Sequence, residues 1–192
     1  MTAKRPIQPE VPSIRSQYEK IGVRRFYERF GSRYANPHEP AIERVLLAAV
    51  AKWSPNLERV LDLACGSGEL TLVLRTLGAG SVQGIDPFTG DSYRERTGVE
   101  AEPLTFEDIA AGALAGRRYS LIACSFALHV VEASRLPTLA YQLSRVADSL
   151  LILTPHKRPV IRPEWGWQLV GEMVVERVRA RYYRSTEPSD RA

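Results

Sequence analysis

The stretch Val60-Leu61-Asp62-Leu63-Ala64-Cys65-Gly66-Ser67-Gly68-Glu69-Leu70 determines the fold that we expect for this chain. An apolar run passes into a turn with two glycines, and a helical segment follows the turn at once. Glycine lets a backbone approach a ligand closely, and the free N–H groups at a helix start attract anionic groups. The stretch therefore predicts a buried strand, a ligand-binding turn and a helix.

Short apolar segments alternate with helical ones on both sides of this stretch. The strands that we expect are Arg59–Ala64, Ser81–Asp86, Ala101–Thr105, Ser120–Ser125 and Leu150–Thr154, and the helices are Pro40–Trp53, Glu69–Leu77 and Leu136–Ala147. Strands separated by helices pair in parallel, and nearly continuous apolar strands indicate cover on both faces. The pattern predicts an α/β fold, a three-layer sandwich with a doubly wound, mostly parallel sheet. Trp165–Arg184 predicts a short β-rich C-terminal segment, either an antiparallel edge pair or one bent strand.

The composition is that of a globular protein with one main domain: 192 residues, of which 44% are hydrophobic and 25% charged. We expect a disordered arm over 1–15, a helical lid over 16–39, the main domain over 40–185 and a loose tail over 186–192. There is neither an apolar run of membrane-helix length nor a signal peptide, so we expect a cytoplasmic protein without a membrane partner. Cys65 and Cys124 are too few for a metal cluster, and no metal is expected.

Acidic residues lie at the ends of the first two predicted strands. A doubly wound sheet binds its ligand beyond the carboxyl ends of its strands. Asp62 is placed to pair with a ligand ammonium, or alternatively to cap the helix that follows. Asp86 is placed to accept hydrogen bonds from a ribose diol. A ligand with an amino acid at one end and a nucleoside at the other fits both residues, and S-adenosylmethionine is such a ligand.

Four segments extend this pattern along the chain in one continuous order: Val60–Gly68, Gly84–Pro87, Phe106–Ile109 and Cys124–His129. Together they resemble the motifs of the class I S-adenosylmethionine-dependent methyltransferases, from about Ala41 to Pro155. The resemblance implies the Rossmann-like fold of that family, S-adenosylmethionine as the cofactor and a methyl-transfer activity. Asp91–Gly98 departs from the family, because a short, charged segment is expected there instead of a regular helix.

The resemblance also implies roles for individual residues. Gly66 and Gly68 would pass under the methionine part of the cofactor, and Asp86 would hold the ribose hydroxyls. The adenine would lie near Pro87 and Phe88, with its edge against Asp108 and Ile109. The full set expected at the cofactor is Asp62, Ala64, Gly66, Gly68, Asp86, Pro87, Phe88, Asp108, Ile109, Ser125 and Phe126.

No residue is assigned to catalysis, but four side chains lie where an acceptor would bind. His129 and His156 follow strands at the functional edge of the sheet, and Tyr34 and His38 lie in the link between two N-terminal helices. Each has an ordinary alternative: a surface histidine for the first pair, and turn chemistry around Asn36-Pro37 for the second.

The identity of the methyl acceptor stays open at this stage. We expect a small molecule. Residues 1–35 and 156–192 carry an excess of Lys and Arg, so an RNA or tRNA methyltransferase, or a binding module with a methyltransferase fold, are the alternatives. Arg177, Arg179 and Arg181 alternate as on a solvated strand face, or as an anion-binding stripe. Thr71 stands where a dinucleotide fingerprint has its third glycine, which disfavours an NAD-dependent oxidoreductase.

Overall fold

A computed structural model of the chain describes residues 38–187. The arm, the lid and the tail expected at the two ends of the chain lie outside the described residues, except for 38–39 and 186–187. Tyr34 lies outside them as well. Within the described part of the chain, none of the helices has the length and the apolar character that crossing a membrane requires.

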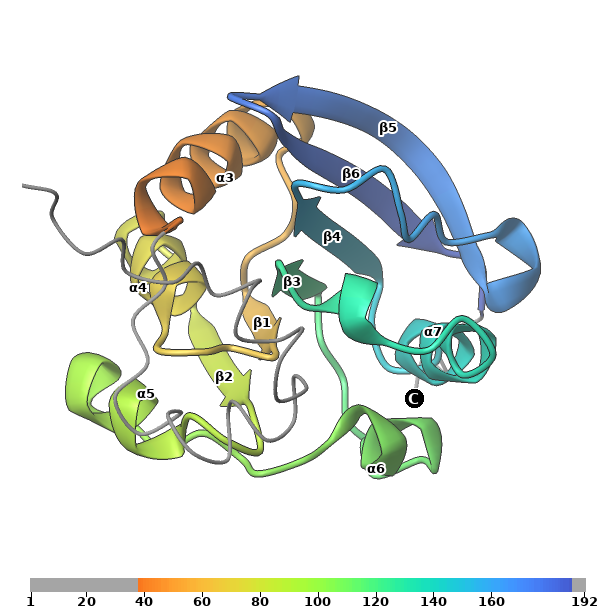
Figure 1. Cartoon of the computed structure of the whole chain (residues 1–192), viewed down its shortest axis with the longest axis horizontal. Helices are drawn as coiled ribbons and strands as arrows, with labels where there is room; N and C mark the ends of the chain where they lie inside the picture. The colour runs from red at the N-terminus through yellow and green to blue at the C-terminus, as the bar shows by residue number, and fades with distance from the viewer. Residues whose placement is uncertain (1–37, 188–192) are drawn as a thin grey trace, which may run out of the picture.

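One six-stranded sheet organises the described residues, with the strand order β2-β1-β3-β4-β6-β5 (Figure 1). The strands are β1 (Arg59–Leu63), β2 (Ser81–Ile85), β3 (Leu121–Ser125), β4 (Ser149–Thr154), β5 (Trp167–Val175) and β6 (Val178–Ser185). The first four pair in parallel, and β6 joins both β4 and β5 in antiparallel fashion. The mostly parallel sheet predicted from the sequence is confirmed, and the C-terminal segment forms the antiparallel pair.

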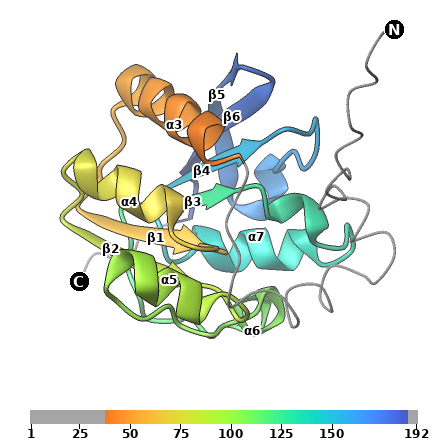
Figure 2. The same ribbon diagram turned by 60° about the vertical axis from the view of Figure 1, so that its left-hand side comes forward.

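Helices cover both faces of the sheet and complete three layers (Figure 2). The helices are α3 (Glu39–Trp53), α4 (Glu69–Thr76), α5 (Gly90–Thr97), α6 (Phe106–Ala110) and α7 (Leu136–Ser144), with 3-10 turns η2 (Leu128–Val130) and η3 (Pro163–Trp165). One apolar core lies between the sheet and α3 with α4, and the other lies between the sheet and α6 with α7. All six residues of β4 are buried, because this strand has helices on both faces and a strand on each side.

Two local expectations were wrong. Ala101–Thr105 is not a strand: Glu102 alone forms a bridge, to Ile85, and Pro103 has no N–H with which to extend the pairing. Asp91–Gly98 does contain a regular helix, α5, which is anchored by the buried Tyr93 and ends at Gly98 with a left-handed φ of 76°. A polar helix held by one aromatic side chain has little periodicity for sequence analysis to detect.

The prediction that Arg177, Arg179 and Arg181 form one solvated strand face was also wrong. Arg181 is buried and pairs with Glu172, which also pairs with Arg179. Arg177 lies in the turn between β5 and β6, where both Glu176 and Arg177 have positive φ. Two-residue hairpin turns with positive φ usually contain Asn or Gly. The sequence Glu176-Arg177 contains neither, so the turn could not be recognised from the sequence.

Close packing between α5 and β2 leaves no room for a side chain at Gly84. A Cβ atom there would lie 2.5 Å from Cζ of Tyr93 and 2.6 Å from its hydroxyl oxygen. Gly84→Ala should therefore destabilise the protein by about 1–3 kcal/mol, as measured by urea unfolding. Gly90→Ala is the matched control, because a Cβ at Gly90 meets nothing within 4 Å. Equal stability of the two variants would contradict the packing described here.

Candidate functional site

The carboxyl ends of the four parallel strands lie at one edge of the sheet. In Figure 2 the arrows of β1, β3 and β4 point to this edge. The glycine turn follows β1 and Asp86 follows β2, while Phe126 and His156 follow β3 and β4. Residues that are far apart in the sequence are therefore gathered at one edge, which is where doubly wound folds bind ligands.

The turn between β1 and α4 is built from left-handed backbone. Ala64, Gly66 and Gly68 have φ values of 57°, 56° and 92°. The N–H of Cys65 donates to the carbonyl of Ile85 at 3.0 Å and so ties the turn to β2. Ala64 carries a side chain in a conformation that favours glycine, and such strain is concentrated at functional sites. The turn is thus held in one shape beside the end of β2.

Asp86 connects this turn to the segment that follows β2. Its Oδ2 accepts from the N–H of Gly66 at 3.3 Å, and its Oδ1 accepts from the N–H groups of Phe88 at 2.9 Å and Thr89 at 3.1 Å. Burial raises the pKa of this carboxyl, and the backbone hydrogen bonds oppose that rise. A carboxylate has about four acceptor positions, so Oδ2 keeps capacity for a further donor, such as a ribose hydroxyl.

Asp62 is buried at the end of β1 and binds the start of α4. Its Oδ2 accepts from the N–H of Thr71 at 3.1 Å and from the Thr71 hydroxyl at 2.7 Å. Burial, and then the charges of Glu69 and Asp86, raise its pKa from 3.8 to about 7 although the Thr71 hydroxyl lowers it. Asp62 thus acts as the helix cap considered from the sequence. No described residue donates to Oδ1, which leaves that oxygen available to a ligand ammonium.

Sequence analysis missed a polar network that lies behind the glycine turn. Arg96 of α5 pairs with Glu39 at 2.5 Å and with the buried Glu69 at 3.4 Å, and Glu69 also accepts from the Ser67 hydroxyl. The network joins the first residue of α3 to the turn. An acid in the first turn of a helix is ordinary, so neither Glu69 nor Glu39 stood out in the sequence.

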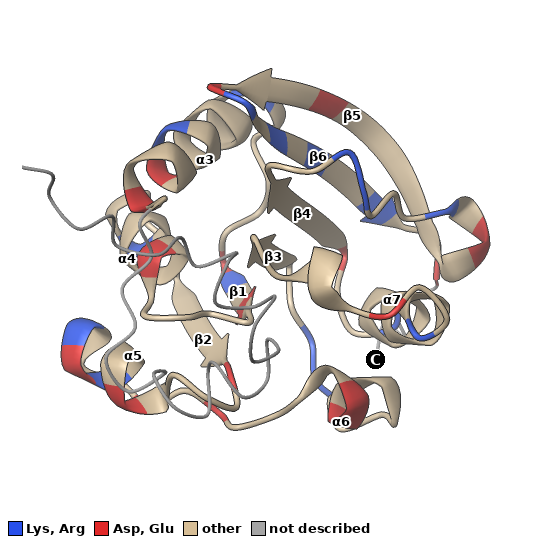
Figure 3. Cartoon of the chain, in the orientation of Figure 1, with Lys and Arg blue, Asp and Glu red and all other residues tan. Residues whose placement is uncertain are grey.

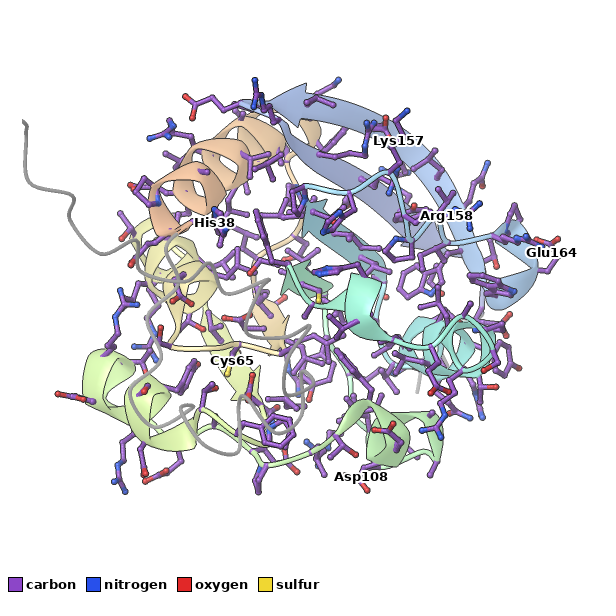
Figure 4. All side chains as sticks on the ribbon, in the orientation of Figure 1. His38, Cys65, Asp108, Lys157, Arg158 and Glu164 are labelled. Carbon is purple, nitrogen blue, oxygen red and sulfur yellow. The ribbon has the colours of Figure 1, made fainter. Side chains whose placement is uncertain are left out.

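Aromatic side chains lie beside the end of β3. Phe126 follows Ser125 with a left-handed φ of 54°, and its N–H donates to the carbonyl of Leu153 at 2.8 Å. The ring of His38, immediately before α3, stacks on Phe126 with centroids 5.2 Å apart. His38 is thereby brought from the N-terminal side of the chain to the functional edge (Figure 4).

The two histidines that follow β3 and β4 are brought together. His129 lies in η2 and His156 follows β4, and their ring centroids are 4.4 Å apart at a tilt of 49°. Desolvation of its ring and then the neighbouring His156 lower the pKa of His129 from 6.5 to about 4. His129 is therefore neutral at pH 7.

The remaining predicted residues lie further along the edge. Pro87 and Phe88 are partly buried in the segment after β2. Asp108 is exposed, and its carboxylate accepts from both the N–H and the hydroxyl of Thr105 in a capping box, which lowers its pKa. Figure 4 shows Asp108 on α6, apart from Cys65 and His38. Ile109 is buried in the core. The positions of Asp108 and Ile109 are explained by the capping and packing of α6.

Comparison with known proteins gives consistent matches. Residues 27–179 match the methyltransferase-domain family. An uncharacterized protein of Schizosaccharomyces pombe is 32% identical to this chain, and the match covers 90% of this chain and 92% of that protein. The magnesium protoporphyrin IX methyltransferase of Synechocystis PCC 6803, solved with bound SAM, is similar in fold: TM-score 0.56, 20% identity, 90% of this chain and 95% of that one. TehB from Haemophilus influenzae has a TM-score of 0.54, 19% identity and coverage of 83% and 67%.

The raised pKa of Asp62 predicts a pH dependence of stability. Between pH 3.8 and about 7, Asp62 holds a proton in the folded state that it has lost in the unfolded state. The contribution of Asp62 to the free energy of unfolding therefore falls as the pH rises through this window, and it stays at its lowest value above pH 7. Asp62→Asn should remove this slope and raise stability above pH 7 by about 1–3 kcal/mol.

Urea unfolding over a pH series measures the difference between the wild type and the variant. Asp91→Asn, on the exposed side of α5, is the control and should keep the wild-type slope. An Asp62→Asn variant that also keeps this slope would show that Asp62 is charged in the folded protein at acidic pH.

Proposed function

This chain belongs to the methyltransferase-domain family, and on that premise we propose that it transfers the methyl group of S-adenosylmethionine to a small-molecule acceptor. The cofactor supplies a methyl group on a cationic sulfonium, which a nucleophile can attack directly. Such a transfer depends on proximity and alignment more than on a covalent enzyme intermediate. The protein's task is to hold the two reactants in line and to keep water away from them.

The observation that carries the proposal is the arrangement of Asp86 beside the glycine turn. Its Oδ2 lies within hydrogen-bond distance of Gly66 N–H and retains acceptor capacity. The carboxylates of Asp62, Glu69 and Asp86 are close enough to interact electrostatically around the same turn. This concentration of negative charge suits a ligand that carries an ammonium and a sulfonium, and it disfavours an anionic ligand such as a dinucleotide pyrophosphate.

We assign the cofactor-binding roles accordingly. Asp86 would accept hydrogen bonds from the ribose hydroxyls, and Asp62 would face the ammonium through Oδ1. The backbone of the Ala64–Gly68 turn would pass under the methionine part, and Pro87 and Phe88 would contact the adenine. Ser125 and Phe126 would line the side nearest the acceptor. The roles of Asp108 and Ile109 at the adenine edge stay predictions.

Within the described residues, the pairing of the positive charges on α3 and β6 favours a small acceptor over RNA. Figure 3 shows Lys and Arg along β6 and along the loop that follows β4. On β6, Arg179 and Arg181 both pair with Glu172, and Arg44 of α3 pairs with Glu176 in the hairpin turn. These pairs interrupt the stripe of positive charge that a phosphate backbone would need. Methyl transfer to small molecules but not to tRNA, measured with radiolabelled cofactor, tests this choice.

Asp86→Ala should weaken binding of S-adenosylhomocysteine by about 1–3 kcal/mol, or roughly 5- to 150-fold, because the ribose hydroxyls lose a charged acceptor. Isothermal titration calorimetry measures the change, and circular dichroism checks the fold. Asp91→Ala removes an exposed carboxylate from the neighbouring helix α5 and should bind like the wild type. Unchanged affinity in Asp86→Ala would remove the main support for this site.

A further inference from the structure

Helix α5 packs against the glycine turn and carries an arginine to which the cofactor-binding roles above give no part. A Cβ atom at Gly68 would lie only 2.5 Å from Cγ2 of Thr97, so the backbone of the turn is in close contact with the end of this helix. Arg96 precedes Thr97, and its Nη1 lies 3.3 Å from the Ser67 hydroxyl oxygen and 3.4 Å from Oε1 of Glu69. Helix α5 therefore places a guanidinium beside the turn.

The carboxylate that Arg96 reaches is buried. Glu69 is 3% exposed, and its Oε1 accepts a hydrogen bond from the hydroxyl of Ser67, which is fully buried. An ionised carboxylate is costly to bury unless a cation and hydrogen-bond donors compensate it. Arg96 supplies a positive charge to Glu69, and its Nη2 pairs with Glu39 at 2.5 Å. The guanidinium is thus held between the first residue of α3 and the start of α4.

The charge of Glu69 acts on the carboxyl group that is proposed to face the ligand ammonium. Glu69 and Asp86 both raise the pKa of Asp62, in addition to the larger effect of burial. Two other titratable groups near Asp62 are neutral at pH 7, because burial raises the pKa of Tyr93 to about 12 and that of the Cys65 thiol well above its usual range. Neither group can therefore balance the negative charges around the turn.

We propose that Arg96 is a positioning residue for the cofactor: its guanidinium balances the charge of Glu69, and Asp62 is thereby kept ionised to bind the ligand ammonium. This proposal rests on the S-adenosylmethionine placement proposed above. Without the guanidinium, the charge of Glu69 beside Asp62 is left unbalanced. The turn then holds an additional proton, which goes to Asp62 because the pKa of this carboxyl is already about 7.

The proposal predicts a particular pH dependence. If loss of Arg96 raises the pKa of Asp62 by about one unit, the ionised fraction of Asp62 at pH 7 falls from about a half to about a tenth. Ligand affinity should then be about fivefold weaker at pH 7, and the difference from the wild type should shrink to less than about twofold near pH 9. A turn that merely lost its shape would bind more weakly at every pH.

Isothermal titration calorimetry with S-adenosylhomocysteine tests this prediction on the full-length protein. The ratio of the Kd of Arg96→Gln to that of the wild type, measured across this pH range, should fall towards one as the pH rises. The titration of the ligand itself cancels in the ratio. Arg96→Lys keeps the charge and should restore most of the wild-type profile. Arg94→Gln is the matched control, because Arg94 lies on the same helix but pairs with the exposed Asp91 and Glu100, and it should bind like the wild type at every pH.

Glu69→Gln tests the same coupling with Arg96 in place, and so does not depend on the folding of Arg96→Gln. Removal of the Glu69 charge should lower the pKa of Asp62 and shift the binding profile to lower pH. In the Glu69→Gln background, Arg96→Gln should no longer produce the alkaline recovery of affinity.

Three results would overturn the role of Arg96: weakening of equal size at every pH in Arg96→Gln, an unchanged profile in that variant, or an unshifted profile in Glu69→Gln. Each of them would leave the proposed function intact, because the wild type still binds the ligand. A wild-type protein that does not bind S-adenosylhomocysteine would instead overturn the proposed function and this inference with it.

Discussion

The carboxylate of Asp86 accepts hydrogen bonds from the N–H groups of Gly66, Phe88 and Thr89, and through them it joins the turn after β1 to the segment after β2. The parallel pairing of β1 with β2 brings these segments together. Tyr93 then packs against Gly84, where a side chain would not fit, and closes α5 onto β2. The shape of the glycine turn therefore depends on a contact between two strands rather than on the glycines alone.

This arrangement has an electrostatic cost, which a positively charged ligand at the proposed site would relieve. Asp62 and Glu69 are buried near Asp86, and burial together with their mutual repulsion raises the pKa of Asp62 to about 7. Arg96 offsets part of the repulsion through Glu69. A ligand with positive charge at the same place would stabilise the ionised forms, so ligand binding and folding stability are coupled at this turn.

Sequence analysis predicted the parts of the site that are local in the chain. The strand, turn and helix around Gly66 follow from apolar periodicity and glycine placement within a few residues of one another. The pairs His38 with Phe126 and His129 with His156 could not be predicted, because each joins residues from different elements and depends on the strand order. Helix α5 was missed because its one large buried side chain, Tyr93, gives no repeating apolar pattern. Glu69 was missed because an acid at a helix start is common.

A crystal structure with bound S-adenosylhomocysteine tests the central claim most directly. Our account predicts that the ribose hydroxyls lie within hydrogen-bond distance of the Asp86 carboxylate and that the ligand ammonium faces Asp62. It also predicts that the sulfur lies on the side of Phe126 and the histidine pair. A ligand bound away from the turn after β1, or with its ribose out of reach of Asp86, would contradict the account.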